Sequence, residues 1–86
     1  MAFRLSTRAT AERLIRPGSQ FRQAGDGRIV STAHVLSVVP DAFGIEHVNF
    51  VVCHEVPGGA AVSTGIRTLA LATFAQQFPQ PVAARR

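Results

Sequence analysis

The sequence predicts one small domain that is mainly β and has helical ends. With 86 residues, 47% of them hydrophobic, the chain can build one core but not two. Residues 28–39 and 45–56 are rich in Val, Ile, Phe and Thr, as strands are. Helical spacing of apolar residues returns near the C-terminus. We therefore expect a mainly β (α+β) fold: a small barrel of about five antiparallel strands with an N-terminal helix and a C-terminal helical turn.

The N-terminal residues favour a short helix followed by a short strand. Residues 7–16 are rich in Ala, Glu, Leu and Arg, and Pro17-Gly18 ends the helix that they predict. Phe21 then lies in a short strand pattern, and Gly25-Asp26-Gly27 is typical of a turn because glycine tolerates positive φ. Residues 1–16 form an N-terminal helical segment in this scheme.

A long hairpin is the firmest element that the pattern predicts. Pro40-Asp41-Ala42-Phe43-Gly44 separates its strands and supplies turn geometry. If Val39 opposes Ile45, the core face carries the apolar residues Val30, Leu36, Val38, Val48, Phe50 and Val52. The other face is then mixed and half exposed, with Ser31, Val35, Ser37, His47, Asn49, Val51 and Cys53. A register slip of one residue would exchange the two faces.

A third strand and a C-terminal helical stripe complete the predicted domain. After a turn at Pro57-Gly58-Gly59, residues 60–67 alternate as one further long strand would. Leu71, Phe74, Ala75 and Phe78 have helical spacing, and Pro79 ends the stripe. Leu69 to Leu71 could instead form a last short strand. The barrel domain therefore spans residues 17–78, and residues 79–86 form a flexible tail.

Several core and turn positions follow one another in a recognisable order. They are Pro17-Gly18-x-x-Phe21-Arg22, Val35-Leu36-x-Val38, Val48-x-Phe50-x-Val52 and Gly65-x-Arg67-x-Leu69-x-x-x-x-Phe74. This order, which covers residues 17–74, resembles short bacterial proteins of unknown function that have an SH3-like barrel. The resemblance implies an SH3-like fold for this chain and implies no activity.

Charge and cysteine usage give the cellular context. All nine basic residues are Arg, and the net charge is +4 over residues 1–28, −3 over residues 29–66 and +3 over residues 67–86. The single Cys53 allows no intramolecular disulfide, so a reducing, cytoplasmic location fits best. No apolar run approaches the roughly 20 residues of a membrane span.

The residue types that carry chemistry are present but dispersed. His34, His47, Cys53 and His54 have no paired metal-ligand spacing, so we expect no metal and no cofactor. Ser37 and His47 oppose each other in the predicted register, yet a catalytic triad needs a third member that the pattern does not supply. We therefore expect a protein that is not an enzyme.

A non-enzymatic interaction module is the function that remains. An unknown protein, or a second copy in a homodimer, would bind the mixed sheet face through Val35, Ile45, His47 and Val51. The alternative is a nucleic-acid-binding accessory protein, in which Phe3 and Phe21 stack on bases and arginines contact phosphates. The arginines assigned to that alternative are Arg4, Arg8, Arg13, Arg16 and Arg22.

Overall fold

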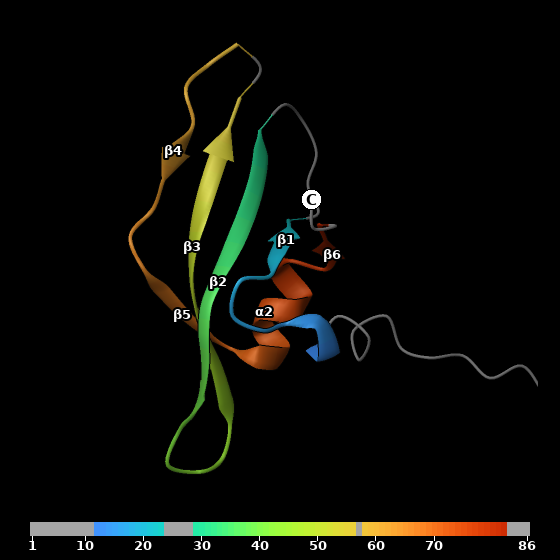
Figure 1. Ribbon diagram of the computed structural model, residues 1–86, viewed down its shortest axis with the longest axis vertical. Helices are drawn as coiled ribbons and strands as arrows, with labels where there is room; N and C mark the ends of the chain where they lie inside the picture. The colour runs from blue at the N-terminus through green and yellow to red at the C-terminus, as the bar shows by residue number, and fades with distance from the viewer. Residues whose placement is uncertain (1–11, 24–28, 57, 83–86) are drawn as a thin grey trace, which may run out of the picture.

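The computed structural model describes residues 12–23, 29–56 and 58–82 (Figure 1). Residues 1–11 of the predicted N-terminal helical segment, the turn at residues 25–27 and residues 83–86 of the predicted tail lie outside these ranges, although residues 12–14 are helical. The elements are β1 (Gln20–Arg22), β2 (Val30–Pro40), β3 (Glu46–Glu55), β4 (Val62–Ser63), β5 (Arg67–Ala70), α2 (Leu71–Gln77) and β6 (Gln80–Pro81).

The described strands form one antiparallel sheet, which confirms the mainly β prediction. The strand order is β4-β3-β2-β1-β6. β5 also pairs with β3, along the same edge as β4. The sheet is open among the described residues, because β6 lies at one edge while β4 and β5 lie at the other. The predicted closure into a barrel is therefore not shown. None of the described helices is long and apolar enough to cross a membrane.

The predicted hairpin exists, but its predicted register was wrong. Val39 pairs with His47 rather than with Ile45, a difference of two residues, because the residue opposite Ile45 is Asp41, whose N–H donates to Ile45 O (2.9 Å). The register also shifts between Val35 and Ser37, where β2 carries a bulge that leaves Leu36 without a partner. Local alternation cannot reveal either event.

The bulge and the shifted register change which side chains of β2 reach the core. Val35 is only 3% exposed, whereas the predicted core residues Val30 and Leu36 are 39% and 46% exposed. Val35 therefore does not belong to the exposed face on which we expected a partner. The β3 half of the prediction is confirmed, since its three predicted core residues, Val48, Phe50 and Val52, are all buried.

The predicted third strand, residues 60–67, is split: β4 covers only residues 62–63 of it, and β5 begins at its last residue and continues to Ala70. β4 pairs with Cys53 and His54, and β5 pairs with residues 47–50, so both run along β3. Between them, Thr64 N–H donates to Val52 O (2.8 Å), and Thr64 Oγ1 accepts the N–H of Val52 (3.0 Å). The hydroxyl thus takes the place of a backbone carbonyl, which ends regular pairing at that point.

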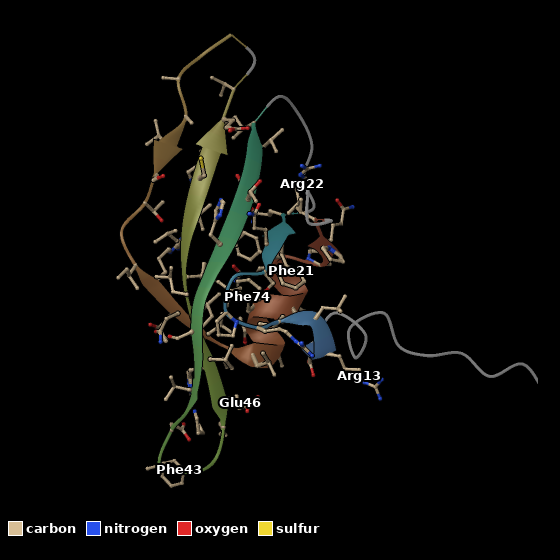
Figure 2. The ribbon with its side chains drawn as sticks, in the orientation of Figure 1. Arg13, Phe21, Arg22, Phe43, Glu46 and Phe74 are labelled. Atoms are coloured by element: carbon tan, nitrogen blue, oxygen red, sulfur yellow. The ribbon has the colours of Figure 1, made fainter. Side chains whose placement is uncertain are left out.

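Four phenylalanines make the centre of the core. Phe74 of α2 stands edge-on to Phe21 and Phe50, with ring centroids 5.6 and 4.9 Å away, and stacks on Phe78 at 5.1 Å. Figure 2 shows Phe21 and Phe74 close together between the sheet and α2. The predicted helical stripe is confirmed, because Phe74, Ala75 and Phe78 are buried. Leu69 lies in β5, which ends at Ala70, and the helix begins at Leu71.

The turn at residues 12–19, which we call the N-terminal turn, is fixed to the sheet. Gly18 N–H donates to Val35 O and Val35 N–H donates to Ser19 O, both at 2.9 Å. Ser19 Oγ donates to Arg16 O (2.6 Å) and accepts from Arg16 N–H (3.1 Å). Ile15 is buried against the core. The N-terminal turn therefore has a defined backbone from which its other side chains project.

Candidate interaction surface

The end of the β2–β3 hairpin, residues 39–47, projects beyond the other elements (Figure 1). We call this segment the hairpin tip. One carboxylate organises it: Asp41 Oδ1 accepts the backbone N–H groups of Phe43 (2.8 Å) and Ile45 (2.9 Å). Gly44 N–H donates to Asp41 O at 3.0 Å, and Gly44 has φ of +82°, a value that glycine adopts without strain. The tip is therefore a hydrogen-bonded turn with a defined shape.

The hairpin tip exposes apolar side chains that the fold does not use. Phe43 is 88% exposed, and Figure 2 shows it at the far end of the hairpin, away from the core phenylalanines. Ile45 and Val39 are 53% and 50% exposed, and the bulged Leu36 lies just before them in the chain. Scattered apolar residues are normal on surfaces, but a gathered set on a fixed turn is typical of a contact site.

The charge of the hairpin tip is negative. Asp41 and Glu46 are both exposed, and residues 29–66 contain neither Lys nor Arg. Hydrogen bonding from the N–H of Ile45 is the main cause that lowers the pKa of Asp41 below its ordinary value of 3.8, and the N–H of Phe43 and nearby His47 act in the same direction. The carboxylate is therefore ionised at neutral pH.

Two of the residues that we expected to bind a partner lie at the hairpin tip. Ile45 is exposed, and His47 is half-buried beside it, with its Nδ1–H donating to Ile45 O at 3.0 Å. His47 Nδ1 also lies 3.9 Å from Asp41 Oδ2. Val51 is half-buried further along β3, opposite His34, and Val35 is in the core. The structure thus brings together Ile45 and His47, but not the four residues as one patch.

A polar row crosses the sheet on the face that carries Val51. Thr68 Oγ1 donates to Asn49 Oδ1 (2.6 Å), and Asn49 Nδ2 donates to Ser37 Oγ (2.9 Å), so the row joins β5, β3 and β2. These side chains satisfy one another's hydrogen bonds. The mixed composition that we expected for this face is present, but its centre is polar and internally bonded.

The serine and histidine that we expected to face each other are apart. Ser37 pairs with Asn49 and His47 pairs with Val39. A different hydrogen bond joins Ser31 Oγ and His54 Nδ1 at 2.8 Å; the predicted register placed Val30 opposite His54, one residue away from this pair. Ser31 is only 8% exposed, so its hydroxyl is poorly placed to attack a substrate. This pair cross-links β2 and β3.

The residues that could hold a metal are spread over different surroundings. His54 bonds to Ser31, His47 bonds to the hairpin tip, and the free Cys53 pairs with Thr32 and Ser63. Within the part of the chain that the structure describes, no three His, Cys, Asp or Glu side chains are close enough to hold a metal ion.

The predicted nucleic-acid surface loses its aromatic component. Phe21 is 0% exposed at the centre of the core, so it cannot stack on a base, and its assignment as a platform was wrong. Arg13, Arg16 and Arg22 are exposed, and Figure 2 shows Arg13 and Arg22 well separated from each other. Phe3, Arg4 and Arg8 lie outside the described residues.

The residue that carries the candidate surface, Phe43, was missed as a functional residue by the sequence analysis. The available signal was an aromatic residue inside a Pro-Asp-x-x-Gly turn, where polar residues are usual.

Comparison of the chain with protein-family models, with curated proteins and with solved structures gives no significant match. The resemblance to SH3-like barrel proteins stays a prediction.

Proposed function

We propose that this protein is a non-enzymatic interaction module that binds another protein through its hairpin tip, with Phe43 as the anchor. The observation that carries this proposal is the 88% exposure of Phe43 on a turn held by Asp41. An aromatic side chain in a prearranged position loses little conformational freedom when it is buried in a partner. Aromatic anchors of this kind dominate the binding energy of many interfaces.

The chemistry of the hairpin tip indicates what its partner presents. Phe43, Ile45 and Val39 need an apolar surface, while Asp41 and Glu46 favour cationic groups around it. Anionic nucleic acid and anionic lipid do not match a tip that carries two carboxylates and no Arg or Lys. We therefore propose a protein partner with an apolar patch bordered by Arg or Lys.

We propose in addition that the open sheet is a variant of the small SH3-like barrel. The strands β1 to β4 follow one another as a meander, and β6 returns across α2 to pair with β1. The first strand, β1, and the last strand, β6, therefore lie side by side. A closed barrel also pairs strands from the two ends of the chain. An experimental structure of the full chain, with the two sheet edges paired or apart, would test this fold assignment.

Site-specific photo-crosslinking tests the proposed function. A benzophenone amino acid at position 43 is compared with the same amino acid at Ala72, which is exposed on α2. In an extract of the producing cells, position 43 should give a discrete protein adduct that position 72 does not give. Excess wild-type protein should compete with this adduct.

Two outcomes would overturn the proposed function. Position 43 could give no adduct beyond those of position 72, which would mean that the exposed aromatic has no binding role. The adduct at position 43 could instead be nucleic acid, recognised by its loss after nuclease treatment. That result would favour the nucleic-acid accessory role.

A further inference from the structure

The chain itself carries a surface with the properties that the hairpin tip requires. The N-terminal turn exposes Leu14, 44% accessible, with Arg13 and Arg16 exposed on either side of the Leu14-Ile15 pair. Ile15 is 7% exposed and anchors this turn in the core. The turn thus offers one apolar side chain between two cations on a fixed backbone.

The two surfaces complement each other in both charge and hydrophobicity. The hairpin tip combines Phe43 and Ile45 with two carboxylates, and the N-terminal turn combines Leu14 with two guanidinium groups. Over the N-terminal turn, residues 12–19, two Arg and one Glu give a net charge of +1, against −2 for the hairpin tip, residues 39–47. Opposite potentials of this kind select the relative orientation of two proteins and accelerate their encounter.

One copy of the chain does not join its own two surfaces. Figure 2 shows Phe43 at the end of the hairpin, whereas Arg13 lies on the turn beside α2, well away from it. Any contact between the two surfaces is therefore made between molecules. Because the surfaces differ, such a contact is heterologous, and each copy keeps a free tip at one end and a free turn at the other.

We propose that the partner of the hairpin tip is a second copy of this chain, whose N-terminal turn receives Phe43 between Arg13 and Arg16. This inference rests on the proposed function and specifies its partner. It makes the protein a head-to-tail assembling module. Since the attraction includes exposed charges, added salt weakens the association.

Sedimentation equilibrium of the purified full chain tests the inference. The wild-type protein should show a weight-average mass that rises above the monomer with concentration, and sodium chloride should reduce that rise. Phe43→Ser removes the anchor, and the double variant Arg13→Glu with Arg16→Glu reverses the charge of the receiving turn. Each variant alone should remain monomeric, with far-UV circular dichroism and a urea midpoint close to those of the wild type.

The mixture of the two variants is the decisive sample. The Phe43→Ser protein retains an intact turn, and the arginine double variant retains an intact tip, so one contact can form between them. The mixture should therefore reach twice the monomer mass and stop there, whereas the wild type continues to larger assemblies. As a matched control, Gln76→Glu places a negative charge at an exposed position of α2 and should leave the wild-type behaviour unchanged.

Three results would overturn the inference. A wild type that stays monomeric at every concentration excludes a second copy, although a position-43 adduct to another protein would still support the proposed function. Dimers of the arginine double variant would indicate a symmetric contact between tips. Assembly of Phe43→Ser to the same extent as the wild type would place the contact elsewhere.

Discussion

Replacement of Phe74 and of Phe43 by Ala compares a buried phenylalanine with an exposed one. Phe74 is 0% exposed and contacts three other rings, with centroid distances from 4.9 to 5.6 Å. Truncation of a buried Phe to Ala costs about 3 to 5 kcal/mol, because apolar contacts are lost and a cavity remains. The same substitution at Phe43, which is 88% exposed, should change the stability by no more than about 0.5 kcal/mol.

The size of the Phe74→Ala effect is large relative to the whole stability. At the usual stability per residue, a domain of this length unfolds with roughly 4 to 13 kcal/mol. A loss of about 3 kcal/mol in a domain of this size lowers Tm by at least about 12 °C. Phe74→Leu keeps most of the side-chain volume and should lose less, so it provides a folded reference if Phe74→Ala does not fold.

Urea and thermal unfolding followed by far-UV circular dichroism provide the measurement. The chain contains no Trp and no Tyr, so intrinsic fluorescence from those residues gives no signal. The urea midpoint should fall strongly for Phe74→Ala and hardly at all for Phe43→Ala, with similar m values for the folded variants. A Phe74→Ala Tm within a degree or two of the wild type would refute the placement of this ring in the core. Equal losses at positions 43 and 74 would refute the exposure of Phe43.

Three further predictions test the register, the split strand and the hairpin tip. Val35→Asp should abolish the cooperative unfolding transition because it buries a charge, while Val51→Asp should cost about 1 kcal/mol. The reverse order of the two variants in thermal melts would mean that Val35 lies on the exposed face of the sheet, as the sequence predicted. Thr64→Val should cost about 1 to 3 kcal/mol in urea unfolding because the N–H of Val52 loses its acceptor. Thr64→Ser keeps a hydroxyl and should stay close to the wild type. Equal losses in the two variants would mean that the hydroxyl of Thr64 does not stabilise the fold. The folded-state pKa of Asp41 is lowered, so the stabilisation from its carboxylate is present above pH about 4 and is lost as the pH falls through that lowered pKa. The difference in urea midpoint between the wild type and Asp41→Asn should therefore shrink toward pH 3. A difference that stays constant with pH would contradict this prediction.

The sequence by itself determined the elements whose signal is local. Alternation and β-branched residues identified the two long strands, Pro40 to Gly44 identified their turn, and the spacing of Phe74 and Phe78 identified the helix that packs on them. These features depend on backbone preference and on one apolar face per element. Both properties are contained in a short window of residues, so a window is enough to predict them.

Only the tertiary structure decided the register, and with it the faces of β2. Both alternate sets of β2 residues are apolar enough to line a core, so the choice between Val35 and Leu36 depends on a bulge and on the closure of the turn at Asp41 and Ile45. A shift of one residue exchanges the faces at no cost to local preference. The contacts that fix the shift come from β1 and residues 18–19, which are distant in sequence.

The candidate site was likewise decided by tertiary contacts. The local pattern places Phe21 in a short strand and Phe43 in a turn, but it does not say which of the two rings the rest of the fold covers. Phe21 is buried because α2 returns over β1 and brings Phe74 against it. Phe43 stays in water because the β2–β3 hairpin extends past the reach of α2, so no apolar surface within the described ranges of the same copy covers it.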